Sequence, residues 1–95
     1  MRLDGLKCVI TGGSSGIGAA TAKRFVAEGA QVLILDINMD VADALADELG
    51  PAATTFYCDV TSEAQVKAAA DDAHGRWGRV DVLVNNAGSE LNRSY

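Results

Sequence analysis

The feature that most constrains the fold is a glycine-rich stretch, Thr11–Gly18, placed between an apolar run and an alanine-rich segment. The run Leu6–Ile10 predicts a β-strand, and Ala19–Val26 predicts an α-helix. Glycines in the turn between them let backbone N–H groups approach a ligand, and the first turn of a helix carries partial positive charge. The strand–loop–helix unit therefore predicts a binding site for a molecule that carries phosphate.

Strands and helices alternate through the rest of the chain. Three further strands are expected, at Gln31–Asp36, Thr54–Cys58 and Val80–Val84. Right-handed crossovers between them give an α/β fold with a parallel sheet of four strands, in the order 3-2-1-4, and helices on both faces. This is an incomplete Rossmann, or doubly wound, fold.

Glycine, proline and capping residues mark the helix ends. Gly29 ends the first helix and Gly50-Pro51 ends the second, whose apolar residues recur at every fourth position. Those residues are Val41, Leu45 and Leu49. Thr61 or Ser62 caps the third helix, where Ser62–Gln65 fits a capping box. The apolar stripe of that helix consists of Val66, Ala69, Ala70 and Ala73.

Charge and cysteine content exclude several classes of partner. The net charge of -5 argues against nucleic acid or an anionic membrane as a partner. Residues 1–5 do not begin a signal peptide, and no apolar run reaches the roughly 18 residues that span a bilayer, so a cytoplasmic location is expected. Cys8 and Cys58 fall on strands that this order separates by roughly 9–10 Å, beyond disulfide reach, so both are expected to be reduced and buried.

The spacing of the glycines distinguishes between kinds of nucleotide-binding loop. A P-loop requires lysine after its last glycine, but Ala19 follows Gly18. The common Gly-x-Gly-x-x-Gly pattern also fails, because Thr21 stands three residues after Gly18. The pattern that fits is Thr-Gly-x3-Gly-x-Gly, from Thr11 to Gly18.

Three later motifs lie in register with this loop. Asp36 ends the second strand, Asp59-Val60 follows the third, and Asn85–Gly88 follows the fourth. Together with the glycine loop they resemble the classical short-chain dehydrogenase/reductase family over nearly all of residues 3 to 88. The resemblance implies a nicotinamide dinucleotide as cofactor and, in a complete enzyme, an alcohol or ketone as substrate. All four motifs lie at carboxyl ends of strands, where ligands bind in open α/β sheets.

The candidate cofactor-binding residues share this edge of the sheet. Gly12 allows the sharp turn, Gly16 admits the pyrophosphate, and Gly18 lets the helix pack closely on the sheet. The full set is Gly12, Ser14, Ser15, Gly16, Ile17, Gly18, Asp36, Ile37, Asp59, Val60, Asn86, Ala87 and Gly88. No metal ligands are expected.

Asp36 favours NAD over NADP. It follows Gly18 by eighteen residues, near the spacing of a ribose-binding acid. Its carboxylate accepts hydrogen bonds from both ribose hydroxyls and repels a 2′-phosphate, and no arginine or lysine at positions 13, 14, 15 or 37 offsets that repulsion. The alternative is a solvated acid at a strand end.

The resemblance also implies roles for the motifs after the third and fourth strands. Asp59 and Val60 would hold the adenine, and Asn86–Gly88 would lie beside the adenosine ribose. Alternatively, Asp59 only initiates the turn before Thr61. Asn85 is expected to tie adjacent strands together.

The chain lacks the catalytic residues that the resemblance implies, which are a serine, a Tyr-x-x-x-Lys pair and an asparagine on later segments. Tyr57 is followed four residues on by Thr61, and Tyr95 is the last residue. Ser89 follows the asparagine motif too closely to match the serine. No residue is therefore assigned to catalysis, and the isolated chain is expected to be inactive.

The first hypothesis is therefore the NAD-binding portion of an oxidoreductase that transfers hydride between nicotinamide and an alcohol or ketone. Residues 1–88 form the N-terminal part of an NAD(P)-binding Rossmann domain, and 89–95 form a truncated or irregular tail. The alternatives are a non-catalytic dinucleotide-binding module and a truncated product without function. A homo-oligomer is expected only for a full-length form.

Overall fold

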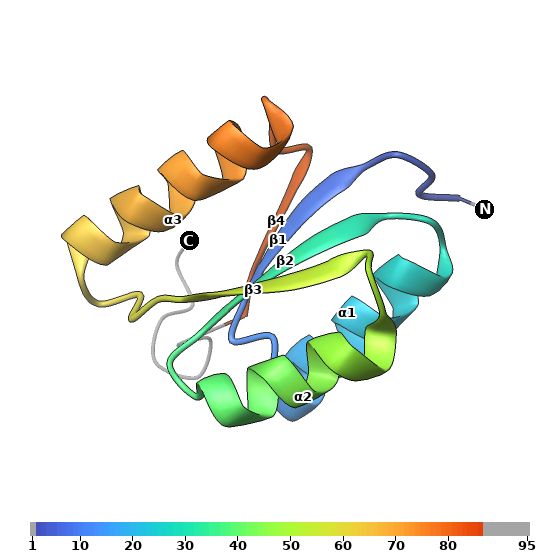
Figure 1. Cartoon of the computed structure of the whole chain (residues 1–95), viewed down its shortest axis with the longest axis horizontal. Helices are drawn as coiled ribbons and strands as arrows, with labels where there is room; N and C mark the ends of the chain where they lie inside the picture. Colours follow the sequence, from blue (N-terminus) through green and yellow to red (C-terminus); the bar gives the residue numbers. More distant parts are fainter. Residues whose placement is uncertain (1, 87–95) are drawn as a thin grey trace.

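A four-stranded parallel sheet forms the centre of the computed structural model, which describes residues 2–86 (Figure 1). Its elements are β1 (Lys7–Thr11), α1 (Gly16–Ala27), β2 (Gln31–Asp36), α2 (Met39–Leu49), β3 (Ala53–Tyr57), α3 (Glu63–Trp77) and β4 (Val82–Asn85). The strand order is β3-β2-β1-β4, which confirms the predicted order. In the centre of the sheet, Val9 of β1 pairs with Leu33 of β2 and Leu83 of β4.

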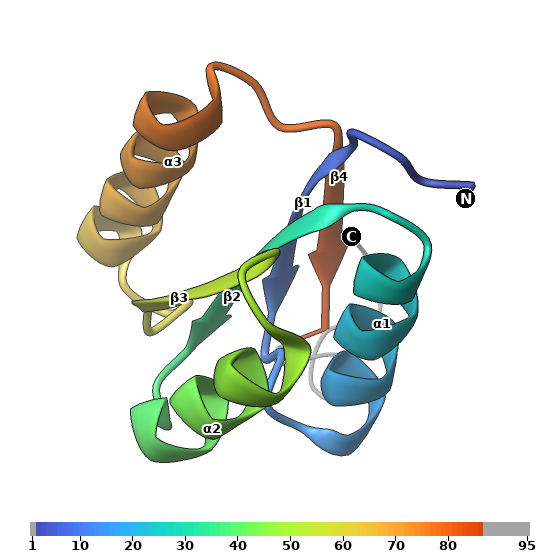
Figure 2. The same ribbon diagram turned by 45° about the vertical axis from the view of Figure 1, so that its right-hand side comes forward.

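Helices cover both faces of the sheet. Among the described residues, Figure 2 shows α1 and α2 on one face and α3 on the other. Successive side chains of a strand point to opposite faces, so Cys8 and Ile10 pack against α1 and α2, whereas Val9 packs towards α3. The two central strands are therefore apolar on both sides, as parallel strands in this kind of fold require.

The observed strand ends differ from the predicted ends by up to two residues. Strand β4 begins at Val82, and Val80, two residues earlier, packs against the apolar core under α3. Pairing with β1 is then fixed by Asp81, whose N–H donates to the Lys7 carbonyl and whose carboxylate accepts from the Lys7 N–H, both at 2.8 Å. The first residue of β4 is therefore set by hydrogen bonding to β1 more than by the β-strand propensity of its residues.

The two cysteines are free and buried, as predicted, but Cys58 lies just after β3 and not within it. Cys8 belongs to the core under α1 and α2, and Cys58 to the core under α3. Burial and a nearby carboxylate raise the pKa of both thiols. Both are therefore protonated at neutral pH and act as small apolar side chains.

The predicted apolar face of α2 is partly wrong. Leu45 is 7% exposed, but Val41 is 45% exposed, and Ala42 is buried in its place. Ala42 has only a methyl group, so the helix can approach the sheet closely along the line from Ala42 to Leu45. Val41 lies to one side of that line because successive residues of a helix are rotated by about 100°.

The predicted stripe of α3 is also divided. Ala69 and Ala73 are buried in the core, whereas Val66 and Ala70 are exposed. Ser62 is the cap, and its Oγ accepts from the Gln65 N–H at 3.3 Å. The capping box is incomplete, because the Gln65 side chain accepts from the Asp59 N–H at 2.8 Å and not from Ser62. Within residues 2–86, no helix has both the length and the apolar character needed to cross a bilayer.

Two substitutions in α2 test which of its residues form the buried face. Leu45→Ala is expected to lower the free energy of unfolding by about 2–5 kcal/mol, because it leaves a cavity in the core. Val41→Ala is expected to change it by no more than about 0.5 kcal/mol, because that side chain is half exposed. Urea unfolding followed by circular dichroism measures both, and equal losses would contradict the burial pattern.

Candidate functional site

The predicted site residues gather at the carboxyl edge of the sheet. The glycine loop follows β1, Asp36 ends β2, and Asn86 follows β4. Hydrogen bonds join all three to one another through the loop. Asp59 and Val60 follow β3 at the same edge, and Ala87 and Gly88 lie outside the described residues.

The loop requires glycine at two of its positions for different reasons. Gly12 has a φ of 64°, in the left-handed region where a side chain is strained. A Cβ on Gly18 would lie 2.2 Å from the carbonyl oxygen of Gly12 and 2.9 Å from the Cα of Gly13. The first turn of α1 therefore touches the loop backbone directly, whereas the sequence predicted that Gly18 lets the helix pack closely on the sheet.

The start of α1 is left open to a ligand. Ser15 is the N-cap residue but gives no side-chain cap, since its Oγ donates to the Gly12 carbonyl at 2.8 Å. By contrast, Asn38 caps α2 and Ser62 caps α3. The first N–H groups of a helix have no partner within it.

The same turn of α1 is exposed. Gly16 faces solvent, and a Cβ built on it would meet nothing within 4 Å. Ile17 is 73% exposed, which is unusual for a large apolar side chain. Uncapped N–H groups, partial positive charge and free space suit an anionic group such as a phosphate.

Asp36 is held by the glycine loop and by the start of α2. Its Oδ2 accepts from the Ser14 N–H at 3.1 Å and also from the Ser14 hydroxyl, and its Oδ1 accepts from the Asn38 N–H at 3.0 Å. Partial burial raises the pKa of this carboxyl, but these hydrogen bonds outweigh it and lower the pKa overall. The neighbouring Ile37 is exposed, and its backbone N–H also lowers this pKa.

The two asparagines at the end of β4, Asn85 in the strand and Asn86 just after it, make different contacts. The Asn85 Oδ1 accepts from the Thr11 hydroxyl at 3.1 Å and links β4 to β1, which fits the predicted tie between strands. The Asn86 Nδ2 donates to the Gly12 carbonyl at 3.2 Å and to the Ser15 Oγ at 2.9 Å. The Asn86 side chain therefore braces the loop, a contact that its place in the motif did not reveal.

Asp59 is engaged in a local turn. Its Oδ1 accepts from the N–H and the hydroxyl of Thr61, at 2.9 and 2.7 Å, and these bonds lower the pKa of the carboxyl. This is the turn role that was the alternative to contact with the adenine. The geometry leaves the contact with the adenine open, because the turn uses only one of the two oxygens.

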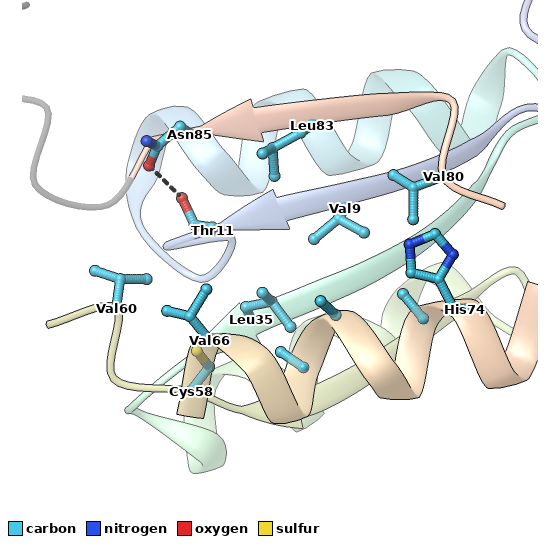
Figure 3. Close-up of a pocket in the computed structure, with 13 residues that line it drawn as sticks. Val9, Thr11, Leu35, Cys58, Val60, Val66, His74, Val80, Leu83 and Asn85 are labelled. Carbon is cyan, nitrogen blue, oxygen red and sulfur yellow. Dashed lines mark hydrogen bonds between the residues drawn. The ribbon is translucent and has the colours of Figure 1, made fainter. Parts of the chain in front are cut away.

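An apolar cavity of about 410 Å³ lies between α3 and the strands β1 and β4 (Figure 3). Val60 lies at its end nearest the glycine loop, and His74 at the far end, with Val9 and Leu83 on the floor between them. Leu83 is 63% exposed. Val60 therefore lines an apolar surface that continues well beyond the carboxyl edge, and its predicted contact with the adenine stays a prediction.

Comparison with known proteins gives consistent matches. The family model for short chain dehydrogenases matches residues 7–94. Momilactone A synthase of Oryza sativa subsp. japonica is 51% identical over 88 residues, covering 92% of this chain and 32% of that protein. Sorbitol dehydrogenase of Cereibacter sphaeroides is 49% identical over 87 residues, covering 92% and 34%.

Solved structures match equally well. The hydroxysteroid dehydrogenase from Escherichia coli superposes with a TM-score of 0.86 at 48% identity, over 92% of this chain and 38% of that one. A 3-ketoacyl-(acyl-carrier-protein) reductase from Brucella melitensis, complexed with NADH, gives a TM-score of 0.82 at 42% identity, over 85% and 34%. The chain thus spans about a third of the length of these proteins.

The contact between loop and helix predicts a difference between two glycines. Gly18→Ala is expected to lower the free energy of unfolding by about 1–3 kcal/mol, because its Cβ overlaps backbone that cannot swing away. Gly16→Ala, two residues earlier, adds the same methyl group into open space and is expected to be neutral or slightly stabilising. Denaturant titration of both variants checks this, and equal stability would refute the close contact.

Proposed function

The chain belongs to the short-chain dehydrogenase family, and from this membership we propose that it is the NAD(H)-binding portion of an oxidoreductase. The complete protein would transfer hydride between the nicotinamide ring and an alcohol or ketone carbon. The observation that best supports binding is the uncapped, exposed start of α1 beside a loop that only glycine can form. Family members include oxidoreductases such as sorbitol dehydrogenase.

The residues present fit a dinucleotide. The N–H groups of Gly16 and Ile17 would hold the pyrophosphate, since the space in front of them is free. Asp36 would accept the ribose hydroxyls, and Val60 would contact the adenine, with Asp59 beside it. Ser14, Ile37 and Asn86–Gly88 would complete the cofactor site around these groups. When bound, the dinucleotide supplies the carbon that donates or accepts hydride.

We assign the preference for NAD to Asp36. Its lowered pKa keeps the carboxylate ionised at neutral pH. A 2′-phosphate would meet this negative charge, whereas the ribose diol of NAD can donate to it. The Brucella melitensis reductase, a relative with 42% sequence identity, has been crystallised with NADH.

We place the chemical step outside residues 2–86. Tyr57 is the one tyrosine among these residues, and Thr61 stands four residues after it, where the Tyr-x-x-x-Lys pair has lysine. The protein's own contribution here is to bind and orient the cofactor. A cytoplasmic location, an N-terminal unit over residues 1–88 and a homo-oligomeric complete form belong to the same proposal.

Binding of the cofactor at Gly16 is tested by a valine substitution. Gly16→Val is expected to keep the fold, since nothing lies within 4 Å of the Cβ position, and to weaken NADH binding by about tenfold or more, a loss of about 1.4 kcal/mol. Gly75→Val is the matched control, because Gly75 of α3 has equally open surroundings away from the loop. NADH fluorescence titration measures both, and unchanged binding in Gly16→Val would refute the site.

The choice of cofactor is tested by charge reversal. Asp36→Arg is expected to shift the preference towards NADPH by about tenfold or more, because removing one charge and adding its opposite changes the energy of a nearby phosphate by about 1–4 kcal/mol. Asp47→Arg makes the same charge change on the exposed side of α2 and should leave both affinities unaltered. If Asp36→Arg leaves the dissociation constants of NADH and NADPH unchanged, Asp36 is only a solvated acid.

A further inference from the structure

Ser14 and Asp36 form a close polar contact across the carboxyl edge of the sheet. Ser14 belongs to the loop after β1, and Asp36 is the last residue of β2. Both donors of Ser14, its N–H and its hydroxyl, reach the same carboxylate oxygen, Oδ2. The hydroxyl proton of Ser14 is therefore directed to Asp36 and not to the space in front of α1.

The other side of the carboxylate is fixed by α2. Oδ1 accepts from the Asn38 N–H, while the Asn38 side chain caps the helix by accepting from the Val41 N–H at 3.4 Å. Asp36 is thus held between two backbone segments and cannot rotate freely. Its partners are neutral, and none of the ion pairs in residues 2–86 includes it, so it keeps its full negative charge.

We propose that Ser14 is a positioning residue that sets the dinucleotide preference through Asp36. This inference rests on the proposed function, and it replaces direct contact with the cofactor as the role of the Ser14 side chain. A carboxylate free to rotate could turn away from a 2′-phosphate. One held by Ser14 stays beside the loop, so it excludes that phosphate, while Oδ1, which accepts from the Asn38 N–H, is the oxygen that a ribose hydroxyl would approach.

The ionisation of Asp36 supports this role. After the opposing effect of burial, hydrogen bonds from Asn38 and from the side chain and backbone of Ser14 lower the pKa of the carboxyl. A lowered pKa stabilises the folded state above the pKa of the unfolded chain, and this contribution is lost as pH falls through the folded value. The contact is therefore fully formed at neutral pH, where the cofactor would bind.

The experiment compares NADH and NADPH binding by the 95-residue chain. Ser14→Ala removes the hydroxyl but keeps the N–H, and Ser14→Thr restores a hydroxyl. A hydrogen bond to a charged group is of moderate strength, so Ser14→Ala should reduce the ratio of the NADPH to the NADH dissociation constant by about threefold to tenfold. Thr55→Val is the matched control, since it removes a 2.6 Å hydroxyl–carboxylate bond to Asp43, away from the loop.

A double-mutant cycle separates action through Asp36 from direct contact with the ligand. In an Asp36→Asn background, Ser14→Ala should leave the ratio unchanged, because the charge that Ser14 positions is gone. Carbon-detected NMR titration of the ligand-free chain gives a second readout, in which Ser14→Ala raises the Asp36 pKa and Ser14→Thr lowers it again.

Several outcomes would overturn the inference. One is a Ser14→Ala chain that loses affinity for both dinucleotides equally, with an unchanged ratio. Another is a wild-type Asp36 pKa at or above the ordinary aspartate value. This measurement uses the wild-type chain and does not depend on the folding of any variant. A wild-type chain that binds neither dinucleotide would instead refute the proposed function together with this inference, and is distinguished from the first case by the absence of any NADH binding.

Discussion

The contact between the first turn of α1 and the glycine loop is the constraint on which the carboxyl edge depends. The carbonyl of Gly12 accepts from the Ser15 N–H, the Ser15 hydroxyl and the Asn86 side chain, at 3.1, 2.8 and 3.2 Å. This one oxygen therefore joins the end of β1, the start of α1 and the end of β4. The convergence is possible only because Gly18 has no Cβ to occupy the same space. A looser loop would separate the helix N–H groups from Asp36, and the two halves of a dinucleotide site would no longer share one edge.

The two faces of the sheet are covered unequally. Two helices pack on the face that contains Ile10 and Ile34, whereas α3 alone covers the opposite face. A helix with its side chains is about 10–12 Å wide, and neighbouring strands are about 4.8 Å apart, so one helix cannot cover four strands. The apolar cavity beside β4 and the exposed Leu83 follow from that geometry.

Sequence reasoning predicted most of the fold because the strongest patterns have one physical solution. Continuous apolar strands with glycine turns and amphipathic helices allow few arrangements, and the predicted strand order is the observed one. Side-chain contacts that depend on the three-dimensional packing of distant residues were harder to predict from the sequence. The Gln65 side chain accepts a hydrogen bond from the Asp59 N–H and does not complete the helix cap. On α2, Ala42 is buried and Val41 is exposed. Spacing along the sequence does not reveal either contact. The contact between Ser14 and Asp36 is of the same kind: 22 residues separate them, and only the pairing of β1 with β2 brings them together.

The Asp36 carboxylate lies near the start of α1, where an anionic ligand would also bind. The two negative groups would use different hydrogen-bond donors of the loop. The Ser14 N–H and hydroxyl donate to Asp36, whereas the start of α1 has no side-chain cap and open space at the Cβ position of Gly16. Ser15 separates these two sets, and its hydroxyl turns inward to the Gly12 carbonyl, which leaves the helix end uncapped. Local donors of this kind explain how a chain of net charge -5 can offer a site for a doubly charged pyrophosphate. In the proposed site, the same division would set which end of a dinucleotide meets which residue, with the pyrophosphate at the helix end and the ribose diol beside Asp36.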